Sequence, residues 1–301
     1  MKVLITGACG MVARALIKEL EPRHELVLLD RIDPSEATVF SPGKAERAKV
    51  PFQPSWPFIK AEVLDDDAIR TAINQSQPDA VVHLAAGVTG LPEIGVETFK
   101  INTVGTYIML NACRLAGVKR FTCASSVNAF GTIYWRLSGK PPVYTSLPLD
   151  EIFPPVPEDA YSLSKYVNEE TCAAFHRAYG ITTAAFRFAG VWSVEMYENT
   201  MRAGLAPTIA WNDDLFQWVH LYDIAAGIRQ ALEAQDLPGH GVYYLGAPDT
   251  RCPEPSLELL RKFRPDLAAN LTQPLAGRAS LISIKRAQEA FGYAPTYRLA
   301  Q

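Results

Sequence analysis

Short runs of apolar residues alternate along the first two thirds of the chain with segments in which apolar residues recur every three or four positions. The runs are apolar throughout, which is typical of parallel strands buried on both faces. They cover residues 3–5, 26–29, 80–84, 121–124 and 183–186. The segments with helical spacing cover residues 13–21, 66–74, 98–117 and 162–179. This alternation predicts an α/β fold built on a Rossmann-type, doubly wound parallel sheet.

Length and composition allow one large core and give no support to a charged macromolecular partner. With 301 residues, 48% of them hydrophobic and 20% charged, the chain is long enough for a large core, and can bury roughly three quarters of its unfolded surface. The formal net charge is -3 and no long basic block occurs, which argues against binding of nucleic acid or an anionic membrane. We therefore expect a small-molecule partner.

The cysteines and the apolar runs favour a cytoplasmic protein. The five cysteines are an odd number and include no C-x-x-C motif, which suits reduced thiols. The chain opens directly into the strand-like residues 2–6, and nowhere are there 18 uninterrupted apolar residues, the length that a membrane span requires. We expect neither export nor a membrane span.

A glycine loop follows the first predicted strand and opens the first predicted helix. Its sequence is Gly7-Ala-Cys-Gly10-Met-Val-Ala13. Free backbone N–H groups and the helix dipole at such a place favour a pyrophosphate, and glycines let the backbone approach it. Ala13 stands where a third glycine is common and is small enough for close packing. The alternative is a tight strand-to-helix turn that binds no ligand.

Asp30 ends the second predicted strand, about 20 residues after the glycine loop. A carboxylate there accepts hydrogen bonds from both ribose hydroxyls and repels a 2′-phosphate, which favours NAD. Arg31 keeps NADP open as the alternative, because an arginine pairs with phosphate. Asp30 also has a simpler interpretation, as a cap of the following turn.

Neither the acidic run nor the histidines indicate a metal site. Residues 65–67 are three aspartates in front of a predicted helix, where they are expected to cap it and form its solvated first turn. The five histidines show no ligand spacing. No metal is predicted.

Tyr161 and Lys165 lie four residues apart at the start of a predicted helix, so their side chains share one face. An ammonium close to a phenol stabilises the phenolate and lowers the phenol's pKa, as a general base requires. A lone Y-x-x-x-K is common on ordinary helices, but Ser125 and Ser126 end a preceding strand at the sheet's carboxyl edge, where α/β active sites form. A serine hydroxyl there is able to hold the substrate oxygen that the tyrosine protonates.

With these motifs the chain resembles the extended short-chain dehydrogenase/reductase family, in its NAD-dependent epimerase/dehydratase group of sugar-modifying enzymes. The resemblance covers nearly the whole length. Beyond the glycine loop and Tyr161/Lys165, its motifs are His83-Leu-Ala-Ala86, Asn102-Thr-Val-Gly105-Thr, Ser125-Ser126-Val-Asn-Ala-Phe130-Gly131, Arg187-Phe188 and Val219-His220-Leu-Tyr-Asp223-Ile-Ala225. It implies that Ser126, Tyr161 and Lys165 form the catalytic triad.

The resemblance also implies the remainder of the cofactor site. Residues 83–86 are similar to the strand end that passes over the nicotinamide ribose, Asn102 to a structural asparagine, and Glu62 to an acidic residue near the adenine. The residues expected at the cofactor are Gly7, Gly10, Met11, Val12, Asp30, Arg31, Glu62, Val63, Leu84, Ala85, Ala86, Asn102, Ser125, Tyr161, Lys165 and Phe188.

Two departures from the family's pattern concern the substrate. Sugar-nucleotide epimerases of this family usually carry an asparagine that touches the substrate diphosphate, and Gly190 stands in its place. Only 28 positions separate Gly190 from Trp218, fewer than in members that wrap a nucleotide. The short segment resembles uronate-type dehydrogenases, but those have an Asn-His pair where this chain has Val127 and Asn128.

Several polar and aromatic residues lie in segments expected to line a substrate cleft. Arginines there are able to fork onto a carboxylate and aromatic rings to stack on a sugar. The candidates for these roles include Trp135, Tyr197 and Trp218, and the predicted substrate-binding set is Thr89, Ser126, Asn128, Arg136, Arg202 and Trp211. For each aromatic or arginine taken alone, packing in the lobe or facing water is the more common role, and we expect no more than two of the six aromatics and arginines named here to bind substrate.

We expect residues 1–186 to form the dinucleotide-binding Rossmann domain with the catalytic residues. Residues 187–301 are expected to form mainly a substrate-binding lobe, from which residues 219–246 return to the core. Two proline-bearing segments, 35–57 and 140–157, predict long loops beside the cofactor and catalytic regions.

The function expected first is an NAD-dependent oxidoreductase that transfers hydride between nicotinamide and a secondary alcohol or ketone of a sugar or sugar acid. Tyr161 would take the hydroxyl proton, Lys165 would lower its pKa and bind the nicotinamide ribose, and Ser126 would orient the reacting oxygen. The alternative is a sugar-nucleotide 4-epimerase, in which NAD stays bound and the hydride returns to the other face. A third hypothesis is a non-catalytic dinucleotide sensor on the same fold. The family also suggests a homodimer formed through helices 98–117 and 162–179.

Overall fold

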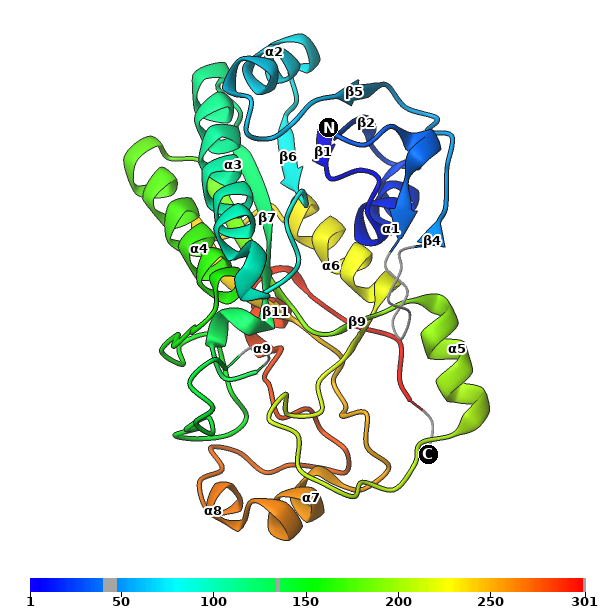
Figure 1. The fold of residues 1–301 in the computed structure, drawn as a ribbon, viewed down its shortest axis with the longest axis vertical. Coiled ribbons are helices and arrows are strands. Elements are labelled where there is room, and N and C mark those ends of the chain that lie inside the picture. The colour runs from blue at the N-terminus through cyan, green and yellow to red at the C-terminus, as the bar shows by residue number, and fades with distance from the viewer. Residues whose placement is uncertain (40–47, 134–135, 300–301) are drawn as a thin grey trace.

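A seven-stranded parallel sheet with helices on both faces forms the centre of the molecule (Figure 1). The computed structural model describes residues 1–39, 48–133 and 136–299. The strand order is β11-β8-β7-β6-β1-β2-β5. The strands are β1 (Lys2–Thr6), β2 (Glu25–Asp30), β5 (Phe58–Lys60), β6 (Ala80–His83), β7 (Arg120–Ser126), β8 (Thr182–Phe188) and β11 (His240–Leu245). The order reverses between β1 and β6, and at such a switch point the carboxyl ends of the strands open a ligand crevice.

Successive side chains of each strand enter two different cores, because a strand's side chains alternate between its faces. Val3 and Ile5 join the core on the side of α1 (Met11–Leu20) and α6 (Leu221–Glu233), and Leu4 joins the core on the other side. The second core lies against α2 (Asp66–Ser76), α3 (Gly95–Ala116) and α4 (Ala160–Tyr179). Burial on both faces explains why the strand segments are apolar throughout.

The segments after β8 form a smaller lobe and also return to the sheet. The lobe holds α5 (Val194–Ala203), α7 (Ser256–Phe263) and α8 (Pro265–Ala268), which Figure 1 shows away from the sheet. Between them in sequence, α6 packs on α1, and β11 pairs with β8 from His240↔Thr183 to Leu245↔Phe188. The last helix, α9 (Lys285–Phe291), packs against β11.

Short elements connect these parts. Two small two-stranded sheets pair β3 (Thr38–Val39) with β4 (Ala48–Lys49) and β9 (Val191–Trp192) with β10 (Val219–His220). Three single 3-10 turns are η1 (Pro34–Glu36), η2 (Pro92–Ile94) and η3 (Val127–Phe130).

The predicted fold class and each predicted strand and helix are confirmed, with shifts of a few residues at the ends. The sequence analysis missed β5 and β11. Both lie at the edges of the sheet, and β5 is only three residues long. The predicted loop 35–57 holds η1, β3 and β4 in its described part.

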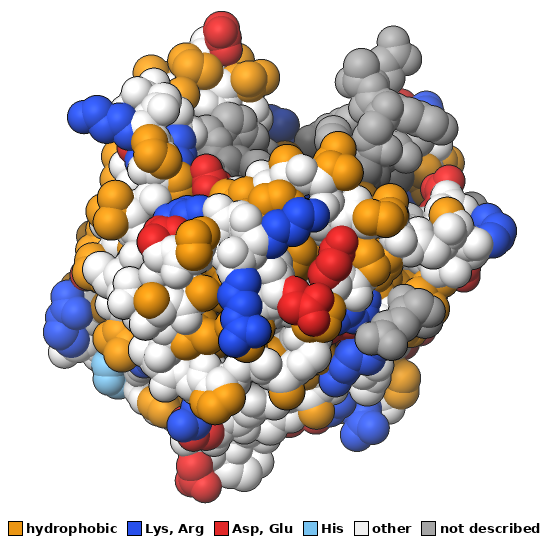
Figure 2. Space-filling model, turned by 90° about the horizontal axis from the view of Figure 1, so that it is seen from below, with side chains coloured by type: hydrophobic (Ala, Val, Ile, Leu, Met, Phe, Trp, Pro, Cys, Tyr) orange, Lys and Arg blue, Asp and Glu red, His pale blue; other side chains and the backbone are white. Residues whose placement is uncertain are grey.

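The face at the lobe's end carries charges of both signs, and the described helices include no candidate membrane span. Seen from the lobe's end, Lys and Arg side chains, Asp and Glu side chains and apolar side chains are interspersed (Figure 2). Within the described ranges, every helix is too short or too polar to traverse a bilayer. His, Cys, Asp and Glu side chains of the described residues nowhere gather in groups of three or more that could hold a metal ion.

Candidate active site

The glycine loop brings the ends of β1 and β6 into close contact beside the start of α1. Gly7 has a left-handed φ of +68°, and a Cβ on it would lie 2.7 Å from the Ala85 backbone nitrogen. Only glycine fits there without a shift of backbone. Gly10 precedes α1, and no described side chain caps this helix end. Met11 and Val12 form its first turn, so their N–H groups are available to an anion.

Asp30 ends β2 beside this loop and is almost fully buried. Its carboxylate accepts a hydrogen bond from Cys9 N at 2.9 Å and one from Ile32 N at 3.0 Å. It therefore fixes the glycine loop against the chain leaving β2 and acts in part as the turn cap considered above. A carboxylate has about four acceptor positions, so the two backbone bonds leave acceptor capacity for ribose hydroxyls.

The residues expected near the adenine line a hollow at the ends of β2 and β5. Its volume is about 560 Å³, and Arg31, Ile32, Ala61 and Glu62 are among its lining residues. Arg31 is exposed and pairs with Glu62 at 3.5 Å. Val63 N–H donates to the Glu62 carboxylate at 3.0 Å. The arginine that would bind a 2′-phosphate already has a carboxylate partner.

The segment after β6 is fixed from two sides. Thr6 Oγ1 on β1 accepts from Leu84 N and Ala85 N, each at 3.2 Å. After Ala86, both backbone groups of Gly87 bond to the Asn102 amide on α3, at 2.8 and 3.0 Å. The same amide donates to Ser164 Oγ on α4 at 2.8 Å.

Asn102 therefore holds the segment 84–87 against α3 and α4. Its side-chain polar atoms are all engaged in these bonds. Asn102 was expected at the cofactor as a structural asparagine, and the geometry gives it a positioning role.

Ser126, Tyr161 and Lys165 come together at the carboxyl end of β7. Ser126 is the last residue of β7 and begins η3, and its hydroxyl accepts from Asn128 N at 3.1 Å. Tyr161 lies in the first turn of α4, which Asp159 caps by accepting from Ser162 N at 2.9 Å. The Ser126 and Tyr161 side chains are hydrogen-bonded to each other.

Lys165 lies one turn further along α4 and is buried. Its ammonium donates to the Ala124 carbonyl at 2.9 Å and lies 5.5 Å from the centre of the Tyr161 ring. Burial lowers the pKa of Lys165 to about 8, while Cys123 and Glu169 act in the opposite direction. The Lys165 ammonium is thus a stronger acid than that of a surface lysine, and it loses its charge only above neutral pH.

The pKa of Tyr161 is raised above its ordinary value in the protein without cofactor or substrate. Burial is the largest cause, the hydrogen bond with Ser126 lowers the pKa, and the charge of Asp159 raises it. The physical reason is desolvation of the phenolate. The ammonium of Lys165 instead makes its hydrogen bond with the Ala124 carbonyl.

Two further cofactor candidates lie beside this group. Phe188 ends β8 directly opposite Ser126 in the sheet register. The Ser125 hydroxyl is buried and donates to Glu169 at 2.5 Å, so it points to α4. Sequence reasoning missed Glu169, although its position four residues after Lys165 on the same helix face was a usable signal.

Of the predicted substrate residues, Asn128 stands next to the catalytic group. It is buried, and its Oδ1 atom has no hydrogen-bond partner among the described residues. Thr89 Oγ1 accepts from Leu91 N at 3.2 Å within its own loop.

The two predicted arginines are engaged elsewhere. Arg136 donates to the Gly131 and Lys140 carbonyls and pairs with Glu158 at 2.9 Å. Arg202 is exposed at the end of α5 and donates to Asn199 at 2.9 Å. The structure therefore does not bring these guanidinium groups to Tyr161 as free carboxylate receptors.

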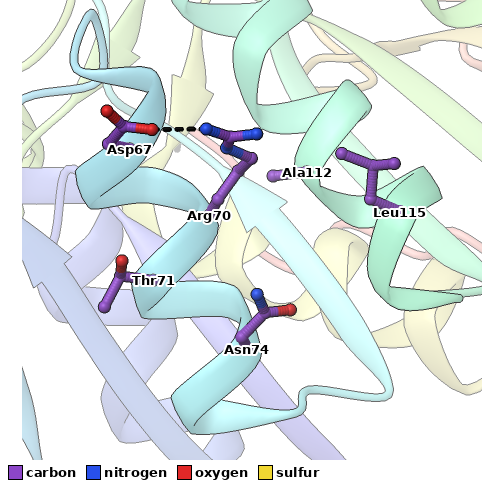
Figure 3. A pocket seen from close by; sticks show the side chains of 6 residues that line it. All are labelled: Asp67, Arg70, Thr71, Asn74, Ala112 and Leu115. Atoms are coloured by element: carbon purple, nitrogen blue, oxygen red, sulfur yellow. Dashed lines mark hydrogen bonds and ion pairs between the residues drawn. The ribbon is translucent and has the colours of Figure 1, made fainter.

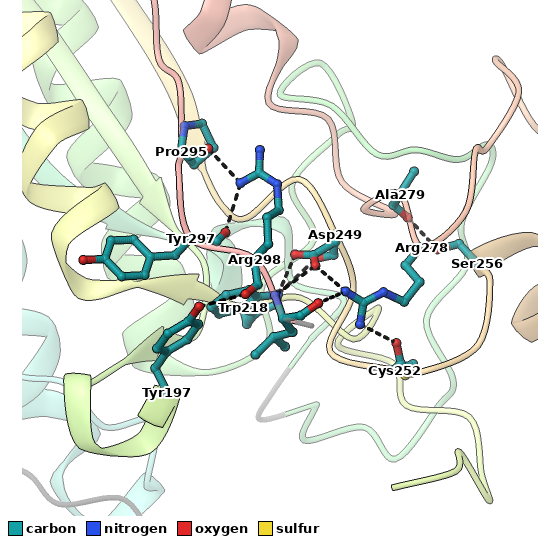
Figure 4. A network of polar contacts seen from close by, with 11 residues as sticks. Tyr197, Trp218, Asp249, Cys252, Ser256, Arg278, Ala279, Pro295, Tyr297 and Arg298 are labelled. Atoms are coloured by element: carbon teal, nitrogen blue, oxygen red, sulfur yellow. Dashed lines mark hydrogen bonds and ion pairs between the residues drawn. The ribbon is translucent and has the colours of Figure 1, made fainter. Parts of the chain in front are cut away.

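The aromatic candidates pack within the lobe. Trp211 donates to Asp213 at 2.8 Å and meets Phe216 edge to face. Trp218 is completely buried and donates to Asp249, and Tyr197 stacks on it (Figure 4). Trp135 lies outside the described residues. Packing, the more common role for such aromatics, accounts for the three described ones.

The space beside Gly190 is filled by a residue that sequence reasoning did not single out. Gly190 N donates to Gln217 Oε1 at 2.5 Å, and a Cβ on Gly190 would lie 3.5 Å from Gln217 Nε2. The two residues are 27 positions apart, so no local pattern indicated the contact. The side-chain amide would lie in van der Waals contact with a Cβ at position 190.

A separate hollow of about 470 Å³ lies between α2 and α3 (Figure 3). Arg70 and Asp67 form an ion pair at its rim, and Leu115 lines its other side. It contains none of the predicted site residues and is not part of the candidate active site.

The model of one protein family matches residues 3–246, and its description is "NAD dependent epimerase/dehydratase family". This match covers most of the chain. The chain belongs to this family. Membership confirms the predicted family, an NAD-dependent enzyme of the extended short-chain dehydrogenase/reductase class, and its cofactor.

Among curated relatives, a putative UDP-glucose 4-epimerase of Methanocaldococcus jannaschii is 31% identical over 193 residues. That alignment covers 63% of this chain and 56% of the relative's length, so the chain matches little more than half of it.

Among solved structures, the UDP-glucose 4-epimerase of Thermotoga maritima with UDP-glucose has a TM-score of 0.68 at 22% identity. It covers 99% of this chain and 95% of its own. The UDP-glucose 4-epimerase of Thermus thermophilus in complex with NAD has a TM-score of 0.64 at 23% identity, covering 98% and 94% of the two chains. At these identities the structures confirm the fold.

The comparisons support a sugar epimerase or dehydratase better than the net dehydrogenation that was expected first. They do not confirm the resemblance to uronate-type dehydrogenases.

Proposed function

We propose that the protein is an NAD-dependent sugar 4-epimerase, which oxidises a sugar's secondary hydroxyl to a ketone and reduces the ketone from its other face. The observation that carries the proposal is the hydrogen-bonded pair of Ser126 and Tyr161 at the carboxyl end of β7, with Lys165 one turn away. This grouping puts Tyr161, a candidate general acid and base, at the same edge of the sheet as the glycine loop.

The residues of the glycine loop and of β2 fit a dinucleotide. Gly7 leaves room that a Cβ would fill, the start of α1 offers unpaired N–H groups to a pyrophosphate, and Asp30 offers a fixed carboxylate to ribose hydroxyls. Asp30 and the pairing of Arg31 with Glu62 support NAD rather than NADP. When bound, oxidised NAD supplies the hydride acceptor and a positive nicotinamide charge.

Tyr161 takes the proton of the sugar hydroxyl and returns it after the reduction. Ser126 holds the reacting oxygen through the hydroxyl that now bonds Tyr161. Lys165, which is largely charged at neutral pH because its pKa is about 8, stabilises the phenolate. Because burial raises the pKa of free Tyr161, the phenolate depends on this charge and on that of the cofactor.

Epimerisation is favoured over dehydration by the residues that follow Ser126. Elimination of water from a sugar needs an additional acid and base, and Val127 and Asn128 in η3 are neither. The curated relative named above is described as a putative UDP-glucose 4-epimerase. Asn128 offers an unpaired amide oxygen to a sugar hydroxyl.

A second candidate is net dehydrogenation of a small sugar or sugar acid. Gly190 offers no side chain to a diphosphate, and the Gln217 amide fills the adjoining space. The segment of 28 positions up to Trp218 is short for wrapping a nucleotide.

One experiment distinguishes the epimerase from the dehydrogenase. The NAD-loaded protein is incubated with UDP-glucose, or with free sugars and sugar acids, while products and NADH absorbance are followed. An epimerase interconverts UDP-glucose and UDP-galactose without accumulating NADH, and a dehydrogenase accumulates NADH with a small substrate.

Affinity gives an independent measure. If the protein is a dehydrogenase of a small sugar, calorimetry should give dissociation constants of UDP and UDP-glucose no tighter than about 1 mM. Micromolar binding supports the epimerase, and absence of any turnover with bound NAD contradicts both candidates in favour of a sensor.

We also propose a homodimer through α3 and α4. Exposed apolar residues follow one face of α3 at helical spacing, namely Val96, Val104, Tyr107 and Leu115. On α4, Leu163 and Tyr179 are also exposed, and the Phe175 ring of this helix meets Tyr107 edge to face. The charge substitution Tyr107→Glu should shift the sedimentation coefficient to that of a monomer, and an unchanged coefficient contradicts the proposal.

A further inference from the structure

A buried ion pair that the acid/base steps do not use lies next to the catalytic group. Arg187 on β8 donates to both carboxylate oxygens of Glu169 on α4, at 2.9 and 2.8 Å. Only 3% and 2% of the two side chains are exposed. Two charges removed from water in this way need close geometry and further hydrogen bonds, and a bidentate pair supplies the geometry.

The pair joins the segments that carry the site. Ser125 on β7 donates to Glu169 at 2.5 Å, and the same Ser125 lies opposite Arg187 in the register of β7 and β8. The guanidinium of Arg187 also lies 4.4 Å from the Phe130 ring, at the end of η3. Because Ser126 follows Ser125 and begins η3, the pair fixes Ser126 relative to α4.

Glu169 also contributes charge to the surroundings of Lys165. The titratable groups that face Lys165 are Tyr161 and Glu169 on its own helix, Cys123 on β7 and His83 on β6. Burial lowers the pKa of His83 to about 3, so this histidine is neutral. Glu169 is the carboxylate among these groups, and its charge favours the ammonium form of Lys165.

We propose that Glu169 and Arg187 are positioning residues of the active site: the pair holds Ser126 in register with Tyr161 and keeps the ammonium of Lys165 charged. Arg187 fixes the carboxylate through two bonds. Glu169 fixes Ser125, whose neighbour Ala124 accepts the hydrogen bond of Lys165. The proposal rests on the acid/base roles given to Tyr161 and Lys165 above.

The test compares Glu169→Gln with a matched acid-to-amide change at another buried pair. Asp249 and Arg278 pair at 2.8 Å in the lobe, with 11% and 9% of their side chains exposed (Figure 4). Asp249→Asn is therefore the control. The double variant Glu169→Gln/Arg187→Met removes both charges and leaves no unpaired guanidinium, which favours a folded protein.

The first measurement needs no substrate. Lysine side chains are labelled with carbon-13, the Lys165 signal is identified by its loss in Lys165→Met, and its pH titration is followed by NMR. We expect Lys165 to titrate at lower pH in Glu169→Gln and in the double variant than in the wild type, and at an unchanged pH in Asp249→Asn.

The second measurement is the pH dependence of kcat. The alkaline limb of kcat should move to lower pH in Glu169→Gln and in the double variant, and a pKa lowered by about one unit reduces kcat about fivefold at the wild-type pKa of Lys165. A merely structural pair would lower thermal stability as the control does and leave the limb in place.

Two outcomes overturn the proposal: a Lys165 titration unchanged in the double variant, or one moved equally by Asp249→Asn. If the Lys165 signal moves as expected but the wild type turns over neither a UDP-sugar nor a small sugar, the proposed function fails and the electrostatic role of Glu169 stands.

Discussion

Replacing Asn102 with alanine should destabilise the protein and loosen the segment 84–87 together. The amide makes three buried hydrogen bonds, two with Gly87 and one with Ser164. At about 1 kcal/mol for each net bond, and about 1–3 kcal/mol where a buried partner is left unpaired, the loss amounts to roughly 3–5 kcal/mol of unfolding free energy. For a chain of this size that corresponds to a fall in Tm of roughly 10 °C.

Asn111→Ala is the matched control on the same helix. Asn111 is half-buried and accepts hydrogen bonds only from Arg114 among the contacts of the described chain. Its replacement should change the unfolding free energy by no more than about 0.5 kcal/mol.

Scanning calorimetry and titration with NAD measure the two effects. Because the segment 84–87 adjoins the glycine loop, the dissociation constant of NAD should rise by about tenfold in Asn102→Ala, equivalent to about 1.4 kcal/mol, and stay unchanged in the control. If Asn102→Ala has the same Tm and the same dissociation constant of NAD as Asn111→Ala, the hydrogen bonds of Asn102 to Gly87 and Ser164 have no energetic importance.

Four further outcomes are expected. Tyr161→Phe should retain NAD affinity and lose at least about 100-fold in kcat, the scale of a positioned base, and near-normal turnover would remove the mechanism. Replacing Asp30 with serine should narrow the preference for NAD over NADP in paired kinetic measurements, and a wild type that already prefers NADP would make Arg31 the selector. Because the pKa of Lys165 is about 8, kcat should fall as the pH rises through that value, where the ammonium is lost, and a flat profile to higher pH contradicts its role. Gly7→Ala should abolish detectable NAD binding because its Cβ meets the Ala85 backbone, and calorimetric binding close to wild type would show that the loop adjusts.

The elements that sequence predicted best are those whose physics is local. A glycine with positive φ after a strand, a carboxylate at the end of the next strand and a tyrosine–lysine pair one helical turn apart all lie within short stretches of chain. Each has a spacing that one strand or helix imposes. The five central parallel strands were equally visible, because burial on both faces leaves few polar positions, whereas the edge strands β5 and β11 were missed.

The substrate residues were harder to predict because their partners are distant in sequence. The Trp218 indole donates a hydrogen bond to Asp249, 31 positions away, and Gly190 N donates one to Gln217, 27 positions away. Arg136, an attractive carboxylate receptor in isolation, pairs with Glu158. Which polar groups stay free in a cleft depends on such contacts, and the pKa of Tyr161 depends on burial that one-dimensional spacing does not report.

The pairing of β11 with β8 has a consequence for the order in which the chain folds. Until residues 240–245 have been synthesised, β8 is an open edge, with Ala184 and Phe186 destined for full burial. The Ile224 and Ile228 side chains of α6, which complete the core beside α1, arrive only slightly earlier. An unpaired apolar edge attracts strands from other molecules. A nascent chain halted before β11 is therefore a substrate for chaperones, and expression of residues 1–186 alone should yield insoluble protein although the glycine loop, Asp30, Tyr161 and Lys165 are all present.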